Sequence, residues 1–315
     1  ITGNTVHFAT DCIGVRVKQI CDCATTGEIV LLENLRFHPE EQAGDPNFAE
    51  ALSELGEIYI NDAFGTAHRA HASTSIIAQF FPETKMFGCL MKKELDSLGK
   101  ALDEPQRPVT AILGGAKIAG KIDIIRRLID SVDNIIIGGG MSYTFIKAQG
   151  GEVGSSLVDP DRIEMAGEII AAAMNQEVAL HLPDDTLVSQ QFSNESSVEI
   201  VDIQQIPEGW IGLDIGPQTI KHYTEVVSGS QTIIWNGPMG VFEMSNFENG
   251  SRAIAHAIAH ATTKGAFSLI GGGDTVAALN EFGLADKVSY ISTGGGALLE
   301  YMEGKTLPGV AAILN

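Results

Sequence analysis

Three glycine triplets, each following an apolar run, constrain the fold of this chain more than any other feature. They occupy residues 138–140, 271–273 and 294–296, whereas 35 glycines in 315 residues would give roughly 0.4 triplets by chance. Glycine at a strand-to-helix turn lets backbone amides approach an anion or a flat base closely. A tight turn without a ligand is an adequate explanation for one triplet, but three at equivalent places indicate ligand-binding turns.

Short β-branched runs alternate with amphipathic stretches along the chain. This alternation predicts an α/β fold of doubly wound parallel sheets with helices on both faces. Asp45 before Pro46 predicts a helix start. The charged segment 90–108 predicts a helix, ended by Pro105 and Pro108, that connects two α/β halves. The expected strands are EIVLL, EIYIND, TAILGG, NIIIGGG, VALHLP, WIGLDIG, TIIWNG, FSLIGGGD and YISTGGG.

The composition limits the class of protein and its partners. A length of 315 residues predicts about two domains, and 44% hydrophobic residues can form a large core. The net charge of −20 argues against binding to nucleic acid or an anionic membrane, and we expect a monomer. Four cysteines (Cys12, Cys21, Cys23 and Cys89) without zinc spacing indicate thiols in a reducing cytoplasm. No signal peptide or bilayer-length apolar run is recognisable.

Two short segments concentrate positive charge in this acidic chain. DAFGTAHRAHAST, residues 62–74, contains Arg69 and two histidines and predicts a small basic pocket. His68 and His71 either orient this pocket or, in the commoner role, satisfy local backbone groups. An anionic ligand would need such a local concentration of cations.

The second segment, GGAKIAGKI, resembles a P-loop but lacks one required residue. Ile122 stands where the P-loop motif needs Ser or Thr to ligate magnesium, so we reject that motif. Lys117 and Lys121 are four residues apart and would share one face of a helix. The pair suits a polyphosphate, and the alternative is a solvated lysine pair.

Eight motifs in order resemble the phosphoglycerate kinase family across almost the whole chain. They are ENLRFHPEE, NDAFGTAHRAHAST, ILGGAK, GGGMSYTFIKA, GLDIGP, WNGPMGVFE, GGGDT and STGGGALLEYMEGKTLPGV. The resemblance implies a glycolytic enzyme with two doubly wound domains that close about a helix. Residues 1–89 would bind phosphoglycerate, and residues 90–315 would comprise the connecting helix, the nucleotide domain and a C-terminal return segment. The implied reaction moves a phosphoryl group reversibly from 1,3-bisphosphoglycerate to ADP, giving 3-phosphoglycerate and ATP.

The resemblance also implies roles for individual residues. Arg36 and Arg69 would hold the phosphate of phosphoglycerate, since guanidinium binds phosphate oxygens bidentately. Glu243 would accept hydrogen bonds from the ribose, and Leu213 would form an apolar wall of the base pocket. Asp274 would act through Mg²⁺, because an acid beside phosphates is otherwise electrostatically costly.

The remaining implied residues surround the nucleotide phosphates. The residues implied to bind ADP or ATP include Gly115, Ala116, Lys117, Lys121, Gly139, Gly140, Asn236, Pro238, Gly240, Val241, Gly272 and Thr275. Lys117 would lie nearest the transferring phosphoryl group, and Gly273 and Gly296 would be further catalytic residues. Such a site needs no protein nucleophile, because positioning and charge neutralisation carry most phosphoryl-transfer catalysis.

Two departures from the family's pattern affect this interpretation. Gly120 replaces the usual Asp between the two lysines. The family's opening region, which carries a catalytic arginine, has no counterpart, and Ile1 aligns inside the first domain. We therefore expect an incomplete first domain and a chain that is inactive alone. A nucleotide-binding relative without catalysis is the alternative, whereas a P-loop ATPase or a nucleotide-dependent oxidoreductase is disfavoured by Ile122 and the missing G-x-G-x-x-G order.

Overall fold

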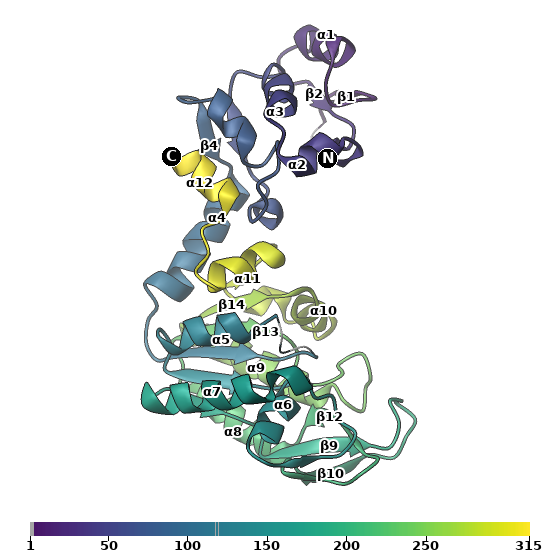
Figure 1. The fold of residues 1–315 in the computed structure, drawn as a ribbon, viewed down its shortest axis with the longest axis vertical. Helices are drawn as coiled ribbons and strands as arrows, with labels where there is room; N and C mark the ends of the chain where they lie inside the picture. Colours follow the sequence, from purple (N-terminus) through teal and green to yellow (C-terminus); the bar gives the residue numbers. More distant parts are fainter. Residues whose placement is uncertain (1–2, 117, 119) are drawn as a thin grey trace. The chain divides into compact units, whose positions relative to one another are not determined.

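A computed structural model describes residues 3–116, 118 and 120–315 of the chain (Figure 1). It divides into two compact units, Ile1–Glu94 with Lys305–Asn315, and Leu95–Gly304. The boundary between them lies inside helix α4 (Cys89–Leu98), and one wide helical turn, Gly99–Asp103, follows. The predicted helix over 90–108 is thus present but ends before Pro105. In the described part of the chain, no helix is long and apolar enough to cross a bilayer.

The second unit is built on a six-stranded parallel sheet with the order β15-β14-β13-β5-β6-β8. Its strands are β5 (Val109–Leu113), β6 (Asn134–Ile137), β8 (Ala179–His181), β13 (Thr232–Asn236), β14 (Phe267–Gly271) and β15 (Tyr290–Ile291). If these six strands are numbered 1 to 6 along the chain, their order in the sheet, starting from β8, is 3-2-1-4-5-6. The winding direction therefore reverses between β5 and β13. The predicted doubly wound sheet is confirmed, and ligands of such sheets bind beyond the strand ends at the reversal.

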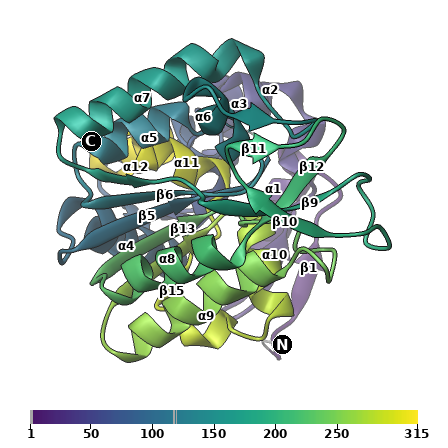
Figure 2. The same cartoon turned by 90° about the horizontal axis from the view of Figure 1, so that it is seen from below.

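Helices cover both faces of this sheet, with α5 and α7 on one face and α8 and α9 on the other (Figure 2). The central strands β5 and β13 are buried along their whole length, as expected when both faces are covered. The helices of this unit are α5 (Ile122–Ile129), α6 (Ser142–Ala148), α7 (Ile163–Asn175), α8 (Pro217–Ser228), α9 (Asn249–Thr263), α10 (Gly273–Glu281) and α11 (Gly296–Met302).

One predicted strand of the second unit does not belong to the parallel sheet. The run WIGLDIG forms β12 (Ile211–Ile215), which pairs antiparallel with β9 (Asp185–Ser189). Strand β10 (Glu199–Asp202) completes this smaller sheet, and β7 (Glu152–Val153) pairs with β11 (Gln205–Ile206). The prediction of a parallel strand was wrong because an apolar run does not reveal the direction of its partner.

The first unit contains two separate parallel pairs of short strands. Strand β1 (Val6–Phe8) pairs with β2 (Ile29–Leu31), and β3 (Tyr59–Asn61) pairs with β4 (Lys85–Phe87). Several apolar side chains of these strands are more than two-fifths exposed: Val6, Phe8, Leu31, Ile60 and Met86. The two pairs therefore leave apolar surface uncovered.

Helices and short turns pack a small core in this unit. Helix α3 (Pro46–Ser53) begins as predicted, because the Asp45 carboxylate accepts a hydrogen bond from the Phe48 amide at 2.9 Å. The other elements are α1 (Val15–Cys23), α2 (Pro39–Ala43), α12 (Pro308–Leu314) and the 3₁₀ turns η1 (Leu35–Phe37), η2 (Phe64–Thr66) and η3 (Ile76–Phe80). Phe48, Leu52 and Phe81 are central to the core.

Helix α8 depends on a carboxylate from another strand for its N-terminal cap. Its own cap residue, Gly216, has no side chain, and buried Asp185 of β9 accepts bonds from the amides of Gln218 and Thr219 and from the Thr219 hydroxyl. We expect Asp185→Ala to lower the free energy of unfolding by about 3 kcal/mol, because it leaves buried donors unpaired. Chemical denaturation measures this loss.

The matched control is Asp286→Ala, which removes an exposed acid that pairs with neighbouring Lys287. It should change the free energy of unfolding by less than about 0.5 kcal/mol. Equal effects of the two substitutions would contradict the capping role of Asp185.

Candidate active site

Two adjoining cavities lie where the winding of the large sheet reverses. The larger has a volume of about 480 Å³ and the smaller about 380 Å³. Both are lined by Gly115 and Ala116, which follow β5, by Pro238, which follows β13, and by Asp274 of α10. The strand order alone predicts a ligand-binding site at this position.

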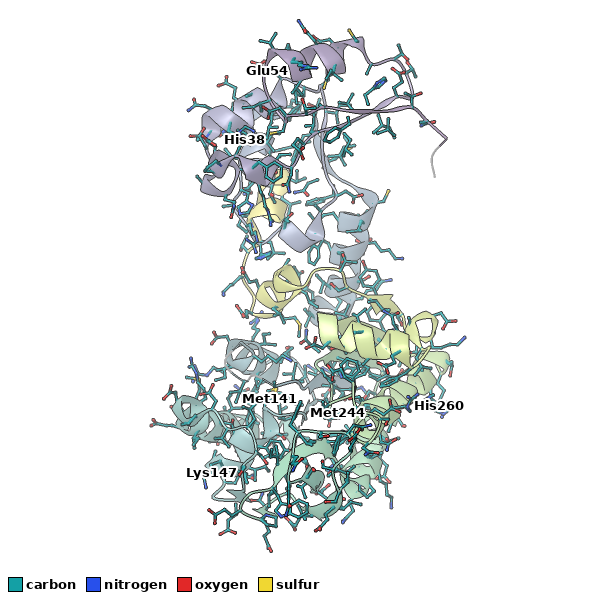
Figure 3. All side chains as sticks on the ribbon, turned by 90° about the vertical axis from the view of Figure 1, so that its right-hand side faces the viewer. His38, Glu54, Met141, Lys147, Met244 and His260 are labelled. Atoms are coloured by element: carbon teal, nitrogen blue, oxygen red, sulfur yellow. The ribbon has the colours of Figure 1, made fainter. Side chains whose placement is uncertain are left out.

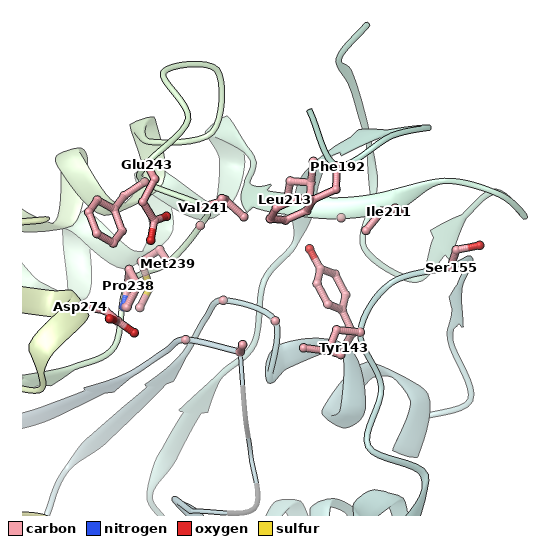
Figure 4. A pocket seen from close by; sticks show the side chains of 18 residues that line it. Tyr143, Ser155, Phe192, Ile211, Leu213, Pro238, Met239, Val241, Glu243 and Asp274 are labelled. Atoms are coloured by element: carbon pink, nitrogen blue, oxygen red, sulfur yellow. The ribbon is translucent and has the colours of Figure 1, made fainter. Parts of the chain in front are cut away.

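The larger cavity has one apolar end and one acidic end (Figure 4). Leu213, Phe192 and Tyr143 form the apolar end, whereas Glu243 and Asp274 lie at the other. The Tyr143 hydroxyl is engaged with the Thr186 hydroxyl at 2.9 Å, so its ring serves as a wall. The complete lining is Gly115, Ala116, Gly139, Gly140, Tyr143, Ser155, Leu157, Phe192, Ile211, Gly212, Leu213, Pro238, Met239, Gly240, Val241, Phe242, Glu243 and Asp274.

Glycine is required in this cavity because backbone segments meet there. Gly139 has a φ of 63°, and a Cβ atom on it would lie 2.5 Å from the Gly115 nitrogen. The Gly139 amide donates to the Met239 carbonyl at 3.1 Å, and the Gly115 amide donates to the Pro238 carbonyl at 2.8 Å. The first glycine triplet therefore allows the backbones of the loops after β6, β5 and β13 to contact one another directly.

The smaller cavity gathers hydrogen-bond donors at the start of α10. Gly272 precedes the helix with a φ of 88° and has no side chain to cap it, and among the described residues no side-chain hydrogen bond to the first amides of α10 is observed. The Asn236 Nδ2 atom is buried and has no hydrogen-bond partner among the described residues. Because a Cβ atom on Gly272 would lie 3.3 Å from that nitrogen, the side-chain amide and the helix start adjoin each other. Free helix amides and an unpartnered buried donor suit an anion.

Thr275 and Asp274 complete this end of the helix. The Thr275 hydroxyl is buried and accepts a hydrogen bond from the Gly237 amide at 2.6 Å, so it holds the turn after β13. Asp274 is exposed and lines both cavities. The full lining of the smaller cavity is Gly115, Ala116, Lys121, Asn236, Gly237, Pro238, Gly272, Gly273, Asp274 and Thr275.

Lys121 is held against the wall of the smaller cavity. Its ammonium donates to the carbonyl oxygens of Gly114 and Asn236, at 2.5 and 2.9 Å, at the ends of β5 and β13. Burial lowers the pKa of Lys121 to about 8, and the charge of Asp274 opposes this shift. Helix α5 begins only at Ile122, so the predicted helical face shared with Lys117 does not include Lys121. Lys117 itself lies outside the described residues.

The predicted basic residues of the first unit lie around His71. Arg36 and Arg69 are exposed, and His71 is buried with its Nδ1 atom 3.9 Å from the Glu41 carboxylate. Burial is the main reason that the pKa of His71 is lowered; Glu41 opposes this shift, and the charges of Arg36, Arg69 and His68 add to it. The structure thus brings these cations together, and the roles of His68 and His71 in the pocket stay predictions.

Comparisons with known proteins agree with this arrangement. A sequence profile described as phosphoglycerate kinase matches residues 1–305. The chain belongs to the phosphoglycerate kinase family. The phosphoglycerate kinase of Chlorobium phaeovibrioides is 53% identical over 308 residues, covering 98% of this chain and 77% of that protein. The enzyme of Moorella thermoacetica is 48% identical over 313 residues, covering 99% of this chain and 78% of that protein.

Solved structures of phosphoglycerate kinases match the fold as well as the sequence. The structure from Coxiella burnetii has a TM-score of 0.89 and 38% identity, covering 98% of this chain and 77% of that one. The structure from Pyrococcus horikoshii has a TM-score of 0.83 and 28% identity, covering 98% and 78%. The resemblance to this family predicted from the ordered motifs is therefore confirmed.

The phosphoglycerate kinase motifs predicted most, but not all, of the cavity lining. Ile211 directly precedes the GLDIGP motif in the same apolar run and could have been found with it. Phe192 lies in an irregular segment without a periodic pattern, so no sequence signal indicates it. Gly296 begins α11 and is not part of the lining of either cavity, so its catalytic role stays a prediction.

Two glycines of the site offer a matched pair of substitutions. We expect Gly139→Ala to lower the free energy of unfolding by about 2 kcal/mol or more, because its positive φ and the neighbouring Gly115 backbone exclude a methyl group. Gly273→Ala should change it by less than about 0.5 kcal/mol, since a Cβ atom there meets no atom within 4 Å. Thermal and chemical denaturation of both variants test this contrast, which similar losses would refute.

Proposed function

We propose that the two adjoining cavities bind ADP and ATP with Mg²⁺ for the phosphoglycerate kinase reaction. In that reaction a phosphoryl group passes between 1,3-bisphosphoglycerate and ADP, giving 3-phosphoglycerate and ATP. One observation carries the proposal. The larger cavity, with its apolar end, adjoins the smaller cavity, whose hydrogen-bond donors suit an anion, at the place where the winding of the sheet reverses. A nucleotide has the same sequence of parts, from a flat base through a ribose to phosphates.

The larger cavity suits the nucleoside half of the ligand. Leu213 and the ring of Tyr143 offer apolar walls to a base, with Gly139 and Gly140 on the adjoining backbone. The exposed Glu243 carboxylate lines the same cavity and is a good acceptor for ribose hydroxyls. Val241 and Gly240 connect this carboxylate to the turn after β13.

The smaller cavity suits the phosphates. The amides at the start of α10 and the Lys121 ammonium would donate hydrogen bonds to an anion, as would the Asn236 amide, which has no partner among the described residues. Asp274 is the exception, because a carboxylate repels phosphate oxygens. Its oxygens are the ligands that Mg²⁺ prefers, so we assign Asp274 to the metal. When bound, the ion would neutralise phosphate charge and orient the oxygens for transfer.

The first unit would supply the other substrate. Arg36 and Arg69, gathered around His71, offer guanidinium groups for the phosphate of phosphoglycerate. In the ATP-forming direction an oxygen of the ADP β-phosphate attacks the acyl phosphate, and the carboxylate of 3-phosphoglycerate leaves. This step needs neither a protein nucleophile nor a proton, so the protein contributes position and charge. We propose that Lys117, Gly273 and Gly296 lie nearest the transferring group.

The thiols and the charge support two further proposals. All four cysteines are free, as expected in a reducing compartment, and we propose a cytoplasmic protein. The net charge of −20 favours mutual repulsion of chains, and we propose a monomer.

The experiment that tests the nucleotide site compares ADP binding with and without magnesium. Asp274→Ala should weaken Mg·ADP binding by roughly ten- to a hundredfold and leave metal-free ADP binding nearly unchanged, because its carboxylate acts through the ion. Isothermal titration calorimetry measures both affinities. Asp286→Ala, the exposed control, should alter neither, and equal losses with and without magnesium would remove Asp274 from the metal site.

The pKa of Lys121 makes nucleotide binding dependent on pH. Below about pH 8 its ammonium is charged and attracts phosphate; as the pH rises through about 8 in the free protein, the charge is lost. ADP affinity should therefore fall by roughly tenfold between pH 7 and pH 9.5. Lys121→Arg should abolish this fall, since guanidinium stays charged. An equal decline in the variant would show that another group titrates.

A further inference from the structure

In the first unit, the side chains of Asp11, Cys12 and His38 bring three different metal-binding atoms together. Figure 3 labels His38. Asp11 and Cys12 follow β1, and His38 follows the η1 turn. A carboxylate oxygen, the thiol sulfur and an imidazole nitrogen all lie within 4.8 Å of one another. The basic residues and both cavities of the active site leave this cluster unused.

Hydrogen bonds already hold the three groups in a fixed arrangement. Asp11 Oδ1 lies 2.8 Å from His38 Nε2 and accepts a bond from the Cys12 amide at 2.7 Å. The His38 ring packs against Phe48, with 5.2 Å between ring centroids. The cluster therefore does not need large side-chain movements to receive an ion.

The surroundings resemble those of a built metal site. The Cys12 side chain is buried and belongs to the core that contains Phe48 and Phe81, whereas the side chains of Asp11 and His38 are 52% and 30% exposed. An ion could enter from the solvent side and rest against an apolar floor. A low-polarity shell of this kind strengthens the interaction between a cation and its ligands.

In the absence of a cation, the contacts of the cluster favour an ionised Asp11 carboxylate and a protonated Cys12 thiol. The hydrogen bond with His38 is the main reason that the pKa of Asp11 is lowered, and burial raises the pKa of the Cys12 thiol to about 11. A coordinating cation deprotonates a thiol even so. On binding, the thiol would release one proton, and the imidazole proton would move from Nε2 to Nδ1, leaving Nε2 free to coordinate.

We propose that Asp11, Cys12 and His38 form a binding site for a divalent cation of the Zn²⁺ class, with water as the fourth ligand. One sulfur, one nitrogen and one oxygen donor suit Zn²⁺ or Co²⁺, whereas Mg²⁺ prefers oxygen alone. Tetrahedral coordination separates neighbouring ligand atoms by about 3.5 Å, so the donors need to shift by only about 1 Å. The ion would tie the loop after β1 to the η1 turn.

Cobalt provides a direct optical test, because a bond between Co²⁺ and a thiolate absorbs in the near ultraviolet. The starting protein is the full chain with Cys21→Ser, Cys23→Ser and Cys89→Ser, in which Cys12 is the remaining thiol. We expect one Co²⁺ per chain with a thiolate charge-transfer band, visible bands of a tetrahedral ion, and one proton released. Added Zn²⁺ should remove these bands.

Variants in that background separate the proposed site from others. Cys12→Ser should abolish the charge-transfer band, and His38→Gln should weaken Co²⁺ binding by at least about tenfold. Asp274→Ala should retain the band, which keeps this test independent of the nucleotide site. Circular dichroism checks folding; if Cys12→Ser misfolds, the more exposed His38→Gln and Asp11→Asn decide. Absence of the band in the starting protein, or full affinity in His38→Gln, would overturn the proposal.

Discussion

The backbone junction between β5 and β13 is the interaction on which the rest of the second unit depends. The Gly114 amide donates to the Asn236 carbonyl at 3.0 Å, and the Gly115 amide donates to the Pro238 carbonyl at 2.8 Å. The Lys121 ammonium bonds carbonyls of both strand ends. Since the sheet winds in opposite directions from this pair, the loops diverge and leave space between them. The cavities exist because these two strands are neighbours.

The electrostatics of the site follow from its backbone as much as from its side chains. A chain with a net charge of −20 attracts an anion only where donors are concentrated. Helix amides at α10 and the buried Asn236 amide supply such donors without adding formal charge. Among the described residues, Lys121 supplies positive charge to the smaller cavity, and Asp274 is the carboxylate to which we assign the metal ion. The balance suits a ligand that arrives with magnesium.

Local sequence patterns predicted a large part of the fold and the site. The strands of the large sheet, the cap at Asp45 and the glycine turns all depend on neighbouring residues in the chain. The pairing of β12 with β9 was missed because an apolar run reads the same in parallel and antiparallel sheets. The position of Lys121 before α5 was also missed, because two lysines four apart fit a helix and a turn equally well.

The sequence by itself determined the residue types, the strand-and-helix alternation and the membership of the phosphoglycerate kinase family, since these reside in contiguous motifs. Only the tertiary structure decided which strand ends adjoin, which buried amide lacks a partner among the described residues and how far burial lowers the pKa of Lys121. It alone brought His38 to Asp11 and Cys12. The physical reason is that pairing, desolvation and metal geometry depend on distances between residues far apart in the chain, which spacing along the sequence does not specify.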